Sequence, residues 1–258
     1  MTVTTMLQTA SATPPAEARW RWYDLLLIGV LWVALLFGGI VLVAIGFMIA
    51  RGGQPDQAAL LASLPFNLAV LAVQAVTLLA AVAAGLRWRH MHWRAIGLIA
   101  TALGWLLGAV AVAVGLRVLM IPLGLLIQAL GLNTDNPQLA FLVPGGVVST
   151  AGFVGMLLLA GVAIAFVEEA FFRGVIYRYL RRWGVGAATL ISALIFAVAH
   201  FNLLVGITAF CLGIGTALVY ERSRSLWASF IVHSVFNTLG IGILYIALLL
   251  GVPIPGVS

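Results

Sequence analysis

Long apolar runs dominate the chain, and short polar segments rich in arginine separate them. A helix needs about 20 apolar residues to cross the ~30 Å hydrocarbon core of a membrane, because it rises ~1.5 Å per residue. The sequence therefore predicts an all-α fold, a polytopic transmembrane helical bundle. The runs that meet or approach the required length predict about seven spans, at 25–50, 66–86, 96–116, 147–167, 187–202, 203–220 and 228–250.

The apolar stretch 96–131 does not fit a simple alternation of spans. It is too long for one span and too short for two, and a split into two would reverse the orientation of every later segment. We therefore expect one tilted span that leads into a kinked or re-entrant segment near 117–131, with Pro122 as the cause. Arg117 lies in the same stretch, where it can snorkel to the membrane surface or pair with a carboxylate.

Composition supports a membrane protein. Of the 258 residues, 64% are apolar and 8% are charged, whereas soluble domains are about 45–50% apolar and about 25% charged. Disorder requires the opposite balance of low hydrophobicity and high charge. The single cysteine, Cys211, excludes an internal disulfide and a cysteine-cluster metal site.

The thirteen lysine-plus-arginine residues are all arginine, which together with the richness in alanine and glycine indicates a bacterial source. With the amino terminus in the cytosol, ten arginines face inward and only Arg51 faces outward, beside Asp56 and Asp135. We expect an integral protein of the bacterial cytoplasmic (inner) membrane, with lipid as a partner. Nucleic acid is not an expected partner, because the arginines form no basic face on a soluble domain. Residues 1–22 are predicted to be a flexible cytosolic tail and 23–258 a single transmembrane domain.

A few polar side chains remain inside the predicted spans. An ionised group at this depth costs at least about 2.5–3.5 kcal/mol, so such residues are candidates for function. At ~1.5 Å per residue, those on the last spans reach a similar depth, nearer the cytosolic side, and we expect them to converge in one cavity. The set is Arg117, Glu168, Glu169, Arg173, His200, His233 and Asn237.

Spacing refines this expectation. Glu169 and Arg173 are four residues apart, so they share a helix face and can pair, either as a structural strut or as support for a site. Glu168 is rotated by about 100° from Glu169 and can point elsewhere in the bundle. His233 and Asn237 also lie four residues apart and present a joint polar edge.

These side chains allow two routes to hydrolysis. In the first, Glu168 takes a proton from a water molecule that His200 orients. His233 and Asn237 then donate hydrogen bonds to the oxyanion of a tetrahedral intermediate. In the second, Glu168, His200 and His233 hold Zn²⁺ with a bound water. The sequence does not separate these routes.

Three motifs, in this order on successive apolar spans, resemble the signature of the CPBP intramembrane proteases. They are EExxxR at 168–173, FxxxH at 196–200 and HxxxN at 233–237. This family contains the type II CAAX prenyl endopeptidases and the bacteriocin-processing, Abi-like proteins. The resemblance covers about residues 147–250, which we expect to form the catalytic core.

The resemblance implies an intramembrane endopeptidase that cleaves a membrane-associated or prenylated protein or peptide. It implies that Glu168 activates water beside His200, and that His233 and Asn237 stabilise the oxyanion. The implied supporting residues are Glu169 and Arg173. Zinc is an alternative cofactor that the resemblance leaves open.

Two other classes of function use similar residues. Buried Glu, His and Arg also build the proton relays of proton-coupled transporters. A non-catalytic protein that gives immunity to a peptide toxin is a further alternative. A transporter predicts substrate flux that survives Asn237→Ala, whereas a protease predicts that this change abolishes peptide cleavage.

Overall fold

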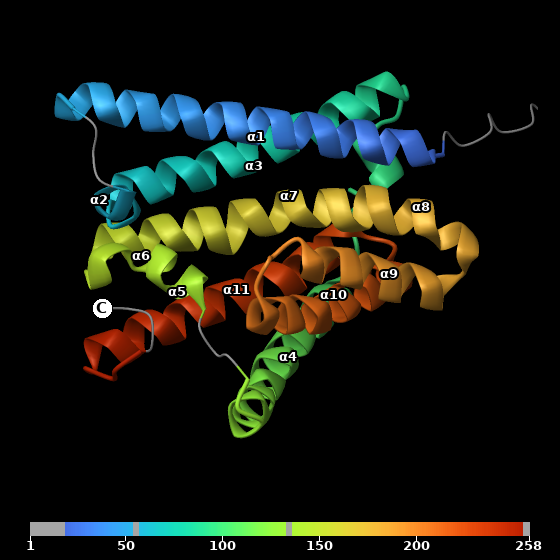
Figure 1. Ribbon diagram of the computed structural model, residues 1–258. Coiled ribbons are helices and arrows are strands. Elements are labelled where there is room, and N and C mark those ends of the chain that lie inside the picture. Colours follow the sequence, from blue (N-terminus) through green and yellow to red (C-terminus); the bar gives the residue numbers. More distant parts are fainter. Residues whose placement is uncertain (1–18, 54–56, 133–135, 255–258) are drawn as a thin grey trace, which may run out of the picture.

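The structure is a computed structural model that describes residues 19–53, 57–132 and 136–254, and within these ranges it contains no strand (Figure 1). Its longer helices are α1 (Trp22–Arg51), α3 (Leu64–Trp88), α4 (Leu103–Ala129), α9 (Val185–Val198), α10 (Leu203–Ser223) and α11 (Leu226–Leu249). Short helices are α2 (Gln57–Leu61), α5 (Pro137–Leu142), α6 (Thr150–Met156), α7 (Ile164–Phe171) and α8 (Arg178–Leu180). Brief 3-10 turns lie at Trp93–Ile96, Pro144–Gly146 and Arg181–Trp183.

Helices α6, α7 and α8 form one continuous rod. Two wide π-helical segments, Leu157–Ala163 and Phe172–Tyr177, join them. Counted with this rod, six helical segments among the described residues are long and apolar enough to cross a membrane: 22–51, 64–88, 103–129, 150–183, 203–223 and 226–249. The predicted all-α transmembrane bundle is confirmed, and the protein is an integral membrane protein.

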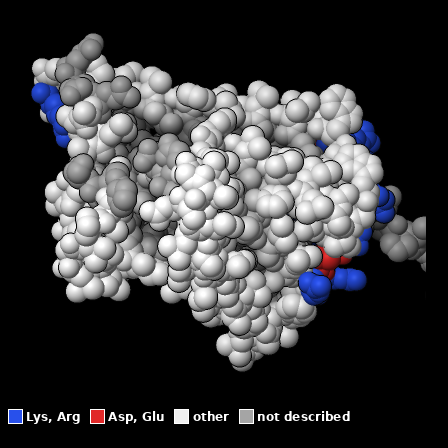
Figure 2. All heavy atoms as spheres, turned by 60° about the horizontal axis from the view of Figure 1, so that its bottom comes forward, with Lys and Arg blue, Asp and Glu red and all other residues white. Residues whose placement is uncertain are grey.

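Charge is confined to the ends of the bundle on the face that Figure 2 shows. The middle of this face carries no charged side chain, while basic and acidic side chains gather where α8 ends and α9 begins. Basic atoms also show at the opposite end of the molecule, where Arg51 lies in the last turn of α1. Helix α1 exposes many apolar side chains, among them Val30, Leu42 and Ile49. Such a surface is suited to lipid rather than water. Asp56 and Asp135 lie outside the described residues.

The α6–α8 rod occupies the centre of the bundle. Helix α7 packs against α3 on one side and α11 on the other, and α1 covers the outer side of α3. Helix α10 pairs with α9 and also contacts α11, while α4 crosses α11 at an oblique angle (Figure 1). The rod is therefore in contact with most of the helices that surround it.

Helix α4 corrects the expectation of a re-entrant segment near 117–131. It is a single helix from Leu103 to Ala129 that continues through Pro122. Its 27 residues span about 40 Å, which suits one tilted crossing. Proline removes only one backbone donor, and membrane helices tolerate this loss, so Pro122 does not end the helix. The helix also begins later than predicted, because residues 97–102 are a loop after the Trp93–Ile96 turn.

The predicted span 187–202 is the short helix α9. Its 14 residues extend about 21 Å, less than the ~30 Å of a hydrocarbon core. The chain turns at Phe201, which has a positive φ of 51° and is 95% exposed. Asn202 then caps α10 by accepting a hydrogen bond from the backbone N–H of Val205. Helices α9 and α10 therefore form a hairpin whose turn lies directly after His200.

The described chain begins at residue 19, and the segment before α1 is already attached to the bundle. Trp20 is buried, and its indole N–H donates to the carbonyl of Gly174 in the second π-helical segment, at 2.9 Å. Arg182 donates to the carbonyl of Trp20 at 2.8 Å. The first eighteen residues of the predicted tail lie outside the described residues.

Candidate active site

The two adjacent glutamates of α7 point in different directions, as their spacing predicts. The side chain of Glu169 is 0% exposed, whereas that of Glu168 is 14% exposed and lines a cavity. Both lie between the π-helical segments, whose wide turns are frequent at functional sites. The helix thus presents one carboxylate to the cavity and encloses the other.

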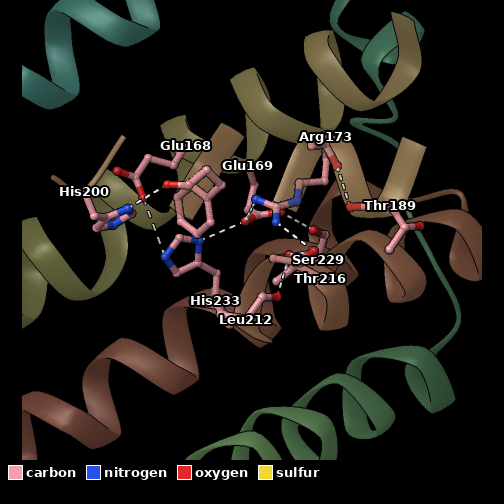
Figure 3. Close-up of polar contacts among 12 residues, drawn as sticks. Glu168, Glu169, Arg173, Thr189, His200, Leu212, Thr216, Ser229 and His233 are labelled. Carbon is pink, nitrogen blue, oxygen red and sulfur yellow. Dashed lines mark hydrogen bonds and ion pairs between the residues drawn. The ribbon is translucent and has the colours of Figure 1, made fainter. Parts of the chain in front are cut away.

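Glu169 is the centre of a fully buried polar network (Figure 3). Arg173 donates to its Oε1 atom at 2.8 Å, which confirms the pairing predicted from the i,i+4 spacing. Ser229 of α11 donates to its other oxygen. Arg173 also donates to the carbonyl of Gly213 on α10, at 3.0 Å. The buried ion pair therefore links α7 to both α10 and α11.

The same carboxylate orients His233. Its Nδ1 atom lies 2.8 Å from Glu169 Oε1, and its Nε2 atom lies 3.7 Å from Glu168 Oε2. Because the carboxylate of Glu169 already accepts from Arg173 and Ser229, it acts as an acceptor, so the Nδ1 atom of His233 carries the proton. The imidazole thus stands between the two glutamates, with Nε2 on the side of Glu168.

His200 reaches the site from the end of α9. Its Nδ1 atom lies 2.8 Å from the carbonyl oxygen of Phe196, one helical turn earlier. A carbonyl can only accept, so Nδ1 carries the proton of the neutral ring and Nε2 remains an acceptor. The ring of Phe196 packs edge-on against His200 and His233, with centroids 4.9 and 5.6 Å away. Phe196 therefore fixes the positions of both imidazoles.

Asn237 lies one turn beyond His233 on α11. Its side-chain nitrogen donates to the carbonyl of Ala160, in the first π-helical segment, at 3.3 Å. An amide nitrogen has two hydrogens, so this bond leaves one donor for another partner.

A cavity of about 630 Å³ connects these side chains. All four residues predicted to be catalytic line it: Glu168, His200, His233 and Asn237. Glu169 and Arg173, predicted to be supporting residues, do not line the cavity and lie behind His233. The structure therefore brings the expected set together, on α7, α11 and the α9–α10 turn.

Arg117 also lines the cavity. It neither snorkels to a surface nor pairs with a carboxylate among the described residues. Instead, its guanidinium donates to the carbonyl of Phe236, and its Cζ atom lies 3.7 Å from the centre of the Phe236 ring. The structure therefore shows neither of the two arrangements that the sequence offers for Arg117.

Residues 150–239 match the family described as type II CAAX prenyl endopeptidase Rce1-like. The resemblance predicted from the three motifs is thereby confirmed for this segment. It supports a CAAX-type intramembrane protease, a hydrolase, in general terms. The comparisons with curated proteins and with solved structures gave no match.

Within the segment that matches the CAAX endopeptidase family, Ser229 is a site residue that the sequence analysis missed. It contacts Glu169 from the turn of α11 that precedes His233. The signal was present, because Ser229, His233 and Asn237 follow one another at four-residue spacing and so share a helix face. Gly213 contributes only its carbonyl, for which no side-chain pattern exists.

Zinc is the alternative cofactor that the sequence leaves open for this cavity. In the part of the chain that the structure describes, no three His, Cys, Asp or Glu side chains are grouped so that they could hold a metal ion. His200 and His233 each direct one ring nitrogen at a protein acceptor, and Glu168 lies 3.7 Å from the other nitrogen of His233. Both rings keep Nε2 for a further partner, as metal-ligating histidines do, so the zinc route stays a prediction beside the metal-free route.

Proposed function

We propose that the protein is an intramembrane endopeptidase that hydrolyses a peptide bond of a membrane-associated or prenylated, CAAX-type protein or peptide, with water activated by Glu168. The proposal rests on one observation: the four predicted catalytic side chains line a single cavity, and the two predicted supporting side chains lie behind them. Glu168, His200, His233 and Asn237 line it, while Glu169 and Arg173 hold His233 from behind.

Glu168 is the proposed general base. Its carboxylate takes a proton from a water molecule whose other hydrogen is accepted by Nε2 of His200. The water oxygen forms a bond to the carbonyl carbon of the substrate, and the carbonyl oxygen becomes an oxyanion. Protonated Glu168 then gives its proton to the amide nitrogen as the C–N bond breaks, so that a carboxylic acid and an amine are released.

The oxyanion is held by donors from α11. The free N–H of Asn237 supplies one hydrogen bond, and Nε2–H of His233 supplies the other when this ring is doubly protonated. During attack the negative charge moves from the Glu168 carboxylate to the oxyanion. The Nε2 side of His233 is directed at both of these groups.

The test compares purified variants on a peptide that carries an S-farnesyl cysteine near its free C-terminus. We expect Glu168→Gln to lower cleavage by at least about 100-fold, since general-base catalysis contributes about 10²–10⁴-fold. Glu221→Gln is the matched control, because Glu221 pairs with Arg181 away from the cavity. Loss of cleavage in both variants, or in neither, would contradict the assignment of Glu168.

A chelator tests the metal-free mechanism. Because no three potential ligands are grouped in the described residues, we expect cleavage to persist after dialysis against 1,10-phenanthroline. Elemental analysis of the dialysed protein confirms that metal is removed. Activity that disappears and returns with added Zn²⁺ would favour the zinc route.

A further inference from the structure

Arg117 is a cation in the cavity that the proposed hydrolysis does not use. Among the described residues that line this cavity, it is the only arginine or lysine. It comes from α4, outside the segment that matches the family, which begins at residue 150. Neither the proposed hydrolysis nor the family match therefore gives this arginine a role.

Helix α11 provides the contacts and the space for the side chain of Arg117. Its guanidinium crosses from α4 to α11, where it donates to the Phe236 carbonyl and stacks on the Phe236 ring. A Cβ atom at Gly240 would lie 3.0 Å from its Cζ atom and 3.2 Å from one of its terminal nitrogens. Gly240, which has no side chain, therefore leaves the space in which the guanidinium lies.

The charge of Arg117 is not compensated by the part of the chain that the structure describes. Its described partners are a carbonyl and an aromatic ring, and its Nε atom is buried without an acceptor. A guanidinium has five N–H donors, and it binds carboxylates through two parallel hydrogen bonds. A half-buried cation without a counter-charge is costly in an apolar bundle, so a negatively charged ligand is the fitting partner.

The position of Arg117 relative to the proposed oxyanion donors agrees with a peptide ligand. It contacts α11 at Phe236 and Gly240, three and seven residues beyond His233. These offsets correspond to about 4.5–10.5 Å along the helix. An extended peptide rises about 3.3 Å per residue, so one to three residues connect a bond at His233 to a group at Arg117.

We propose that Arg117 binds the free C-terminal carboxylate of the substrate, and that the protein thereby selects peptides by their terminus. This inference rests on the proposed endopeptidase function, since it places the terminus beside the bond to be cleaved. It makes Arg117 a specificity-determining residue, separate from the groups that activate water.

The experiment compares two S-farnesyl cysteine peptides of the same sequence, one ending in a carboxylate and one in an amide. We expect wild type to cleave the acid about 10- to 100-fold better in kcat/KM, since a charge-assisted pair is replaced by a neutral contact. Arg117→Gln removes this preference by slowing the acid alone, and Arg117→Lys retains part of it. Arg51→Gln, at the far end of α1, is the matched control. Equal cleavage of acid and amide by wild type overturns the inference.

A third peptide, an amide with an aspartate near its end, separates a terminal carboxylate from an acidic side chain. Recovery of full activity on this peptide overturns selection by the terminus. Binding of the acid and amide peptides to Glu168→Gln provides a readout without cleavage. Suppose that Glu168→Gln binds the acid more tightly than the amide, that adding Arg117→Gln abolishes this difference, and that wild type cleaves neither peptide. The endopeptidase proposal then fails, and the carboxylate site stands.

Discussion

At the scale of single residues, the site depends on two carboxylates that are neighbours in sequence but differ in surroundings. Glu168 faces the cavity, where it can reach water and substrate. Glu169 is fully buried and accepts hydrogen bonds from Arg173, Ser229 and His233. One turn of helix thus carries both the proposed general base and the group that orients a neighbouring imidazole.

The buried pair of Glu169 and Arg173 leads to a prediction for stability. Glu169→Gln or Arg173→Met alone leaves a buried charge without its partner, and we expect each to destabilise the protein by about 3–5 kcal/mol. The double variant should lose less than the sum of both. Unfolding in mixed detergent micelles measures these differences.

The exposed pair of Arg181 and Glu221 provides the control for this prediction. Its side chains are 43% and 27% exposed, so its removal should change stability by less than about 1 kcal/mol. Additive losses at Glu169 and Arg173 would contradict a coupled buried pair.

The sequence was sufficient to predict most of this residue-scale picture. Polar groups are rare in these spans, so their positions identified the Glu169–Arg173 pair and four of the residues that line the cavity, Glu168, His200, His233 and Asn237. Spacing could not show that Glu169 holds His233, because this contact joins residues 64 positions apart. The position of Arg117 likewise depends on how α4 crosses α11.

At the scale of elements, the site is positioned by close contact between helices. A Cβ atom at Gly213 of α10 would lie 3.0 Å from the Cα and Cβ atoms of Ala193 on α9. The carbonyl of Gly213 also accepts from Arg173. The short distance between α9 and α10 therefore determines where the hairpin presents His200.

Gly213→Ala tests this dependence. The added methyl group forces α9 and α10 apart, and we expect a loss of about 1–3 kcal/mol in stability together with reduced peptide cleavage. Gly186→Ala, in α9, is the matched control because nothing lies within 4 Å of its added Cβ. The control should keep full activity and gain up to about 1 kcal/mol. Equal behaviour of the two variants would contradict the packing argument.

The lengths and boundaries of the helices were predicted less well than the residues of the site. Hydropathy identified the apolar runs but not the length of α9, which ends where Phe201 adopts a positive φ. It also could not show that α4 continues through Pro122, or that π-helical turns flank α7. These features depend on hydrogen bonds and packing between helices, which a window of apolar residues does not encode.

At the scale of the whole molecule, the arginines mark the two ends of the bundle. Arg178, Arg181 and Arg182 lie at the end of the central rod, and Arg222 lies near the end of α10. Arg51 lies at the other end, in the last turn of α1. The excess of arginine at one end favours a cytosolic location for that end, as the sequence predicts.

Single cysteines test this orientation. In a Cys211→Ser background, Arg222→Cys and Gly53→Cys place thiols at exposed positions near opposite ends of the bundle. In intact bacterial cells, a membrane-impermeant maleimide should label Gly53→Cys, and it should label Arg222→Cys only after the membrane is opened. The reverse pattern would contradict the proposed topology.

The pairing of Glu169 with Arg173 within one helix also has a consequence for biogenesis. The two side chains are one turn apart, so their ion pair forms as soon as the helix does and does not wait for α10 or α11. The insertion machinery can then release Glu169 and Arg173 into the lipid as a neutral pair. Later synthesis of α11 adds Ser229 and His233 to an anion that is already in place.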